Sequence, residues 1–137
     1  MKKTVIILIA VIYVASIAIV TYFGLKHQTY HTIIPVADVE IVNEGIKYTS
    51  DNKKYIVLNT ADNPDRTFQL ECVVTPSDAD NPALSYLVSD TRTATVDENG
   101  LVTFITDDPF ISVIVYVEST DGTRIGDSIE ITFLTFD

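Results

Sequence analysis

The sequence predicts an all-β domain, a β-sandwich of about seven strands, preceded by one N-terminal transmembrane α-helix. A long uncharged run near the start of the chain predicts the helix. From Val36 onward, apolar and polar side chains alternate, and turn-forming residues separate the alternating segments, which predicts the strands. At 137 residues the chain has room for one domain and hardly for two.

The uncharged run covers residues 4–25. At about 1.5 Å of rise per residue this run reaches roughly 33 Å as a helix, and the hydrocarbon layer of a bilayer is about 30 Å thick. We therefore expect residues 1–25 to form a membrane anchor that contacts the lipid bilayer. The expected anchor residues are Val5, Ile6, Ile7, Leu8, Ile12, Ile17, Ile19 and Val20.

A cleaved signal peptide is the alternative to an anchor. Its apolar core has about 7–15 residues and ends at small residues around the cut, and residues 16–18 (Ser-Ile-Ala) could serve as that site. The apolar run continues to Phe23, which favours the uncleaved anchor. The single apolar run predicts a single-pass protein of the cell membrane. Lys2 and Lys3 outnumber the single Lys26 on the far side of the helix, so the positive-inside rule predicts its orientation. Its N-terminus would be cytoplasmic and its C-terminal domain extracellular.

Charge and composition exclude several function classes. The formal net charge is -10, which argues against a nucleic-acid partner, since such a partner needs Lys and Arg at its phosphates. The single Cys72 excludes an intrachain disulfide and a multi-cysteine zinc site. The β domain has no histidine, so a serine or cysteine nucleophile would lack its usual base. We expect no catalytic residue, no cofactor, no small-molecule substrate and therefore no enzyme.

Residues 26–35 are the expected stalk between the anchor and the β domain, which we place at residues 36–137. His27 and His31 in the stalk have no carboxylate or cysteine nearby, so we expect polar residues at a headgroup boundary and no metal site. Clustered loop carboxylates can bind calcium, but acidic turns are common because Asp and Asn suit turns. We expect no metal. The best calcium candidates would be Asp78, Asp80 and Asn81.

Apolar side chains at every second position predict half-buried strands. The clearest row runs from Ile111 to Val117, and Phe68 to Val74 is expected to form one strand with Cys72 buried as a small hydrophobe. Further rows begin near Val36, Tyr55, Leu84, Ala94, Leu101 and Ile129. The pairs Asn99-Gly100 and Asp121-Gly122 predict hairpins whose two central residues both have positive φ.

The stretch from Val73 to Phe104 carries a specific run of motifs: Thr-Pro at the end of a strand, a central aromatic residue, Ser-Asp, Ala-Thr-Val-Asp and Gly-Leu-Val-Thr. This run resembles the centre of the bacterial immunoglobulin-like group 2 domain, found in intimin-like and invasin-like surface proteins. Looser similarity extends from Val36 to Leu134. The matching motif residues are Tyr86, Asp90, Ala94, Val96, Asp97, Gly100 and Val102.

The sequence departs from the family's pattern in three places. Tyr86 stands where Trp is frequent, residues 107–110 replace a glycine, and residues 47–67 are longer and more polar than the usual opening strands. The resemblance implies an Ig-like extracellular module with a structural or adhesive role, no activity and no conserved active site.

Two functions stay open. The first is a structural or adhesive surface module that binds a protein or an envelope polymer, and the second is an accessory single-pass subunit of a larger membrane or filament complex.

An isopeptide bond would need a buried lysine beside a carboxylate. Lys47, Lys53 and Lys54 lie in polar sequence surroundings, so we expect none. Exposed aromatic residues could form an interaction patch. The candidates are Tyr48, Tyr55, Phe110 and Phe136.

Overall fold

The computed structural model describes residues 2–26 and 31–136. The chain divides into two compact units, Met1–Thr32 and Ile33–Asp137. The first unit contains one helix, α1 (Lys2–Lys26), which has no acidic residue in its first turn. Every side chain that the structure describes in α1 is exposed.

The second unit is built from strands, ten of them among residues 31–136. They are β1 (Asp38–Ile41), β2 (Lys47–Tyr48), β3 (Lys54–Asn59), β4 (Thr67–Gln69), β5 (Cys72–Thr75), β6 (Leu84–Val88), β7 (Ala94–Val96), β8 (Leu101–Phe104), β9 (Phe110–Ser119) and β10 (Gly126–Leu134). The expected all-β class is confirmed, and the expected number of about seven strands was too low.

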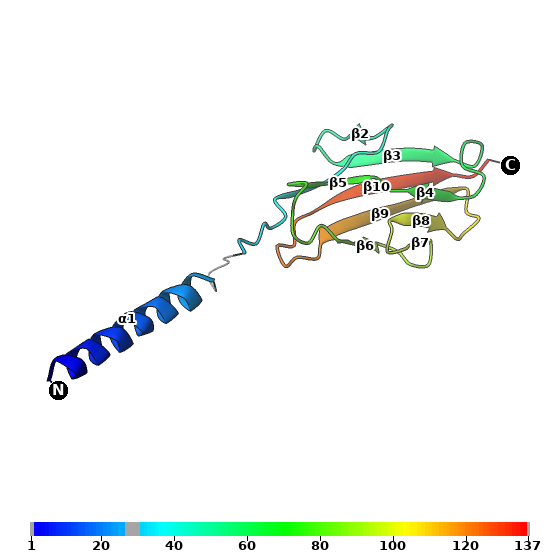
Figure 1. Ribbon diagram of the computed structural model, residues 1–137. Coiled ribbons are helices and arrows are strands. Elements are labelled where there is room, and N and C mark those ends of the chain that lie inside the picture. The colour runs from blue at the N-terminus through cyan, green and yellow to red at the C-terminus, as the bar shows by residue number, and fades with distance from the viewer. Residues whose placement is uncertain (1, 27–30, 137) are drawn as a thin grey trace. The chain divides into compact units, whose positions relative to one another are not determined.

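Two layers of strands face each other (Figure 1). One layer is a five-stranded sheet in the order β2-β3-β10-β9-β6, and the other contains the pair β1-β5 and the three strands β4-β8-β7. All neighbouring strands are antiparallel except β3 and β10, which run parallel. This arrangement is an Ig-like β-sandwich.

Two local features account for the additional strands. The two-residue strand β2 pairs with the start of β3 and covers part of its edge. The row expected as one strand from Phe68 to Val74 is divided, because β4 pairs with β8 and β5 pairs with β1. At the division, the side-chain amide of Asn43 donates to the carbonyl of Gln69 and accepts from the N–H of Glu71, both at 2.8 Å. Asn43 thereby satisfies backbone groups at the division between the two ladders.

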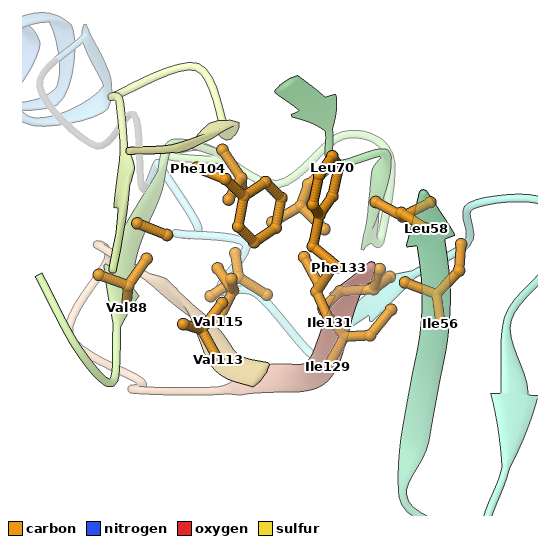
Figure 2. Packing of buried hydrophobic residues seen from close by; sticks show 14 of the residues in the cluster. Ile56, Leu58, Leu70, Val88, Phe104, Val113, Val115, Ile129, Ile131 and Phe133 are labelled. Atoms are coloured by element: carbon orange, nitrogen blue, oxygen red, sulfur yellow. The ribbon is translucent and has the colours of Figure 1, made fainter. Parts of the chain in front are cut away.

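The core lies between the layers and follows the period-two pattern (Figure 2). Every second residue of β9 is buried, from Ile111 to Ser119, as its apolar row predicts. Phe104 of one layer stacks on Phe133 of the other, with ring centroids 4.7 Å apart and planes at 25°. Cys72 packs against the margin of this core as expected of a small hydrophobe, but it is only half-buried.

The two predicted hairpins form, but with a different turn geometry. Gly100 (φ 81°) and Gly122 (φ 95°) are left-handed, whereas Asn99 and Asp121 are not. In the first hairpin the N–H of Asp97 donates to the carbonyl of Leu101 at 3.1 Å, so three residues form the loop and its glycine alone has positive φ. This is a three-residue loop that ends in a left-handed glycine, and the two-residue turn was the wrong prediction.

A side-chain ion pair joins β1 to the five-stranded sheet. Lys54 of β3 pairs with Asp127 of β10, and its Nζ donates to the carbonyl of Ile41 at 3.1 Å. The N–H of the same Ile41 donates to Asp127 at 2.9 Å. Glu40 lies 3.8 Å from the Lys54 ammonium. The pair therefore satisfies both backbone groups of Ile41 at the free edge of β1.

The Lys54 side chain is only 12% exposed, so it is more buried than its polar sequence surroundings indicated. Burial alone lowers the pKa of the amine, but the hydrogen bond and charge of Asp127, with the charge of Glu40, raise the pKa above its usual value. Amide formation needs an unprotonated amine. The raised pKa keeps Lys54 protonated at neutral pH, so this geometry favours an ion pair over an isopeptide bond.

Replacing Phe133 by Ala tests the core. We expect a loss of about 3–5 kcal/mol in the free energy of unfolding, because the cavity lies where the two layers meet. Phe110→Ala is the matched control, since Phe110 is 64% exposed and its loss changes stability by about 1 kcal/mol or less. Urea unfolding followed by near-ultraviolet circular dichroism measures both. Equal losses in the two variants would contradict the position of the core.

Replacing Lys54 by Met tests the ion pair. We expect a loss of about 1–3 kcal/mol at neutral pH, between the values for exposed and fully buried pairs. Because the folded-state pKa of Lys54 is raised, this contribution is fully present below the unfolded pKa of about 10.4 and disappears as the pH rises through the folded pKa. Urea unfolding across that range measures it, with the exposed Lys53→Met as the control. An intact mass that lacks one water would show an amide bond instead.

Candidate functional site

The expected anchor residues all lie in α1. Their side chains are between 51% (Ile17) and 71% (Val20) exposed, so the helix presents an apolar surface all round. The hydroxyl groups of Ser16 and Thr21 donate to the carbonyls of Ile12 and Ile17, four residues earlier, both at 2.8 Å. This satisfies the two hydroxyls within the helix and leaves an outer surface suited to lipid. By length and composition, α1 qualifies as a membrane span, and a signal sequence would qualify in the same way.

Two aspartates hold the segment that enters the β-sandwich. The N–H of Ile34 donates to the carboxylate of Asp80 at 2.6 Å, and the N–H of Asp80 donates to the carbonyl of Ile34 at 3.0 Å. The N–H of Val36 donates to Asp121 at 2.7 Å. Residues 33–35, which the sequence assigned to the stalk, thus belong to the second compact unit.

Asp121 is well suited to accept a hydrogen bond from the entering segment. The hydroxyl of Thr123, the N–H of Val36 and the N–H of Thr123 all donate to its carboxylate. These donors lower the pKa of Asp121 to about 2, so it is ionised throughout the physiological range.

The calcium candidates lie in the loop between β5 and β6. Asp80 binds the entering segment, and the side chain of Asn81 accepts from the N–H of Ala83 at 3.2 Å. Within residues 2–26 and 31–136, no three His, Cys, Asp or Glu side chains come together as a possible metal site. Asp78 is exposed. His27 lies outside the described residues, so its expected role beside His31 stays a prediction.

Tyr86, the central aromatic motif residue, connects β6 with β5 and with the turn between β7 and β8. Its ring lies against Gly100, where an added Cβ would be 2.9 Å from the ring carbon Cζ. Its hydroxyl lies near the thiol of Cys72 in β5. Burial, with the proximity of Cys72 and Asp97, raises the pKa of Tyr86 to about 12. Burial is also the main cause that raises the pKa of the Cys72 thiol, which is therefore protonated and a poor nucleophile at neutral pH.

The two motif aspartates accept hydrogen bonds in turns. Asp90 accepts from the N–H of Arg92 and the hydroxyl of Thr93, both at 3.0 Å, and these bonds, with the Arg92 side chain, lower its pKa. Asp97 accepts from the N–H of Asn99 and of Leu101, both at 2.8 Å. Both carboxylates are thus occupied by the backbone of their own turns, as Asx-type turns require.

The remaining motif residues are apolar and face the core. Ala94 and Val102 are fully buried, and Val96 is partly buried and pairs with Val102 across the β7–β8 hairpin. In the described part of the chain, the motif residues form hairpins and packing contacts and surround no cavity with catalytic side chains. Their geometry supports a structural role for each of them.

The sequence did not reveal how Arg66 is used. Its guanidinium lies 5.3 Å from the centroid of the Phe133 ring, donates to the carbonyl of Thr106 and pairs with Asp107 at 3.2 Å. Asp107 belongs to the segment that replaces the family's usual glycine. The departure from the family pattern therefore adds a partner for a cation that covers the edge of the core.

Replacing Gly100 by Ala tests the contact with Tyr86. Positive φ alone costs about 1–2 kcal/mol for an L-residue, and we expect a further loss of about 1–3 kcal/mol from the clash with the ring. Gly122→Ala is the control, because Gly122 also has positive φ but no atom near its added Cβ. The further loss should disappear in a Tyr86→Leu background, as a double-mutant cycle of thermal unfolding would measure. If it persists there, the ring is not its cause.

Residues 56–106 match the family model described as Bacterial Ig-like domain (group 2). The match begins within β3, includes all seven motif residues and ends directly before Asp107, where the sequence departs from the family pattern. No curated protein matches the chain. The resemblance that the motifs predicted is thereby confirmed: residues 56–106 match the bacterial Ig-like domain of group 2.

Proposed function

We propose that this chain is a membrane-anchored surface module in which the Ig-like domain has a structural or adhesive role. The proposal rests on one observation: the same chain contains an apolar helix with exposed side chains and a match to the group 2 bacterial Ig-like domain. In the proposed topology α1 crosses the cell membrane once, its N-terminus is cytoplasmic and the sandwich is extracellular. Lys2 and Lys3 at the start of the helix support this orientation.

The proposed activity is binding without catalysis. Group 2 Ig-like domains are structural or adhesive modules, and the carboxylates and the thiol of the motif region are engaged with their own turns and packing contacts. The proposed partner is a protein or an envelope polymer that contacts exposed loops, strand edges or the outer face of the sheet. A nucleic acid is a poor partner because the net charge is -10.

One observation favours a second candidate, an accessory subunit of a membrane complex. Small side chains produce a shallow apolar groove along one face of α1, and a second helix could pack closely there. The groove is lined by Ile7, Ala10, Val11, Val14, Ala15 and Ala18. In this case the sandwich would brace the assembly outside the membrane.

Membrane extraction and intact mass test the anchor. We expect the full-length chain to stay in the membrane fraction after an alkaline carbonate wash, with residues 1–18 still present in its mass. Arginine at the centre of a spanning helix costs about 2.5–3.5 kcal/mol per residue, so Ile12→Arg combined with Ile17→Arg should release the protein. The double Leu variant at the same two positions is the control. A mature chain that begins after Ala18 and is recovered in the medium would refute the anchor.

Helix replacement separates the two candidate functions. If the sandwich is an adhesive module, exchange of residues 4–25 for a polyleucine span should leave surface binding unchanged. If the chain is an accessory subunit, the exchange removes helix contacts and abolishes fixed-ratio co-purification with partner subunits. Labelling of Cys72 in urea-treated intact cells and in opened cells reports the side of the membrane. A cytoplasmic β domain would contradict both functions.

A further inference from the structure

The outer face of the five-stranded sheet carries exposed aromatic residues at the end where β9 begins and β10 finishes. Phe110 and Phe136 are 64% and 62% exposed. Phe110 pairs directly with Leu134, and the N–H of Thr135 donates to the carbonyl of Pro109, so the ladder continues past the end of β10. Cross-strand neighbours on one face have Cβ atoms about 4.5–5.5 Å apart, which places Phe110 and Leu134 side by side. Phe136 follows two residues after Leu134, just beyond the end of β10.

Acidic residues stand in the loops next to this apolar cluster. Asp62 lies beside Asn59, whose backbone pairs with Leu134, and the hydroxyl of Thr135 donates to the carbonyl of Asp108. Asp62, Asp65, Asp107 and Asp108 are all exposed. Arg66, which lies among these loops, pairs with Asp107. We name Phe110, Leu134 and Phe136, with Asp62 and Asp108, the Phe110–Phe136 surface.

We infer that the Phe110–Phe136 surface docks a basic polypeptide segment in which Lys or Arg residues flank an apolar side chain. This inference rests on the proposed binding role and assigns it a partner class. Exposed phenylalanines have no polar atom to hydrate, so covering them is favourable, and such patches are typical of interaction sites. The aspartates at the rim supply charge that selects a cationic partner and accelerates its approach.

Charge complementarity also decides between occupants. A second copy of this chain would place the same aspartates opposite one another, and like charges across an interface are unfavourable. An anionic lipid surface would be repelled for the same reason. A neutral polymer would gain nothing from the acidic rim. A cationic polypeptide segment uses both the apolar centre and the charged rim.

A defined peptide tests the inference on the full chain in nanodiscs of zwitterionic lipid. The probe is a fluorescein-labelled peptide with one phenylalanine among alternating lysine and glycine residues, and empty nanodiscs give the background. Fluorescence anisotropy measures the dissociation constant. We expect the affinity to fall about tenfold when both phenylalanines are changed, Phe110→Ser with Phe136→Ser. Leu87→Ser is the matched control, because Leu87 is 63% exposed elsewhere on the same sheet, and it should bind like the wild type.

Charge variants complete the test. Asp62→Asn with Asp108→Asn should lower the affinity about threefold at about 50 mM salt and have little effect at about 500 mM, because salt screens exposed charges. Asp78→Asn, at an exposed aspartate in the loop between β5 and β6, is the control. Unchanged thermal unfolding shows that each variant is folded.

Several results would overturn the inference. These are equal binding by all variants, equal binding of the same peptide with glutamate in place of lysine, a loss caused by Leu87→Ser, or a concentration-dependent dimer that the phenylalanine variants abolish. Since peptide binding in nanodiscs does not depend on cellular topology, a failure here leaves the membrane anchor untouched.

Discussion

The fold depends on the inward row of apolar side chains that β9 and β10 present together. Their nine paired residues place Ile111, Val113, Val115, Ile129 and Ile131 on one face, each at most 3% exposed. Hydrogen bonds to β3 and β6 on the two sides occupy the backbone groups of this pair. The two layers are therefore held together by the burial of apolar side chains between them, where Phe133 stacks on Phe104.

Features with a local signature could be predicted from the sequence. Burial in alternate positions follows from strand geometry, so the row from Ile111 to Val117 was recognised, and the motifs around Tyr86 and Gly100 identified the family. The geometry of the Asn99-Gly100 turn was wrong, because the dipeptide signal does not fix the loop length. A three-residue loop needs positive φ at the glycine alone.

Features that depend on distant residues could not be predicted. Asn43 divides an apparently continuous strand from 26 positions away, and Asp121 binds the N–H of Val36 across 85 positions. A bond between a side chain and a remote backbone group leaves no periodic trace in a sequence. The same reason hid the pairing of Lys54 with Asp127, although both residues stand in recognisable strands. The strand β2 has only two residues, too few to show a period.

The segment at Ile34 and Val36 has a mechanical consequence. If the chain is pulled from its N-terminal side, the load enters the sandwich through the backbone bonds to Asp80 and Asp121 and then passes lengthwise into β1. A force directed along β1 loads the hydrogen bonds of the β1–β5 ladder in shear, so they must rupture together. Bonds loaded in this way do not break one after another. The Lys54–Asp127 ion pair, which hydrogen-bonds the backbone of Ile41, adds a second attachment at the far end of the same strand.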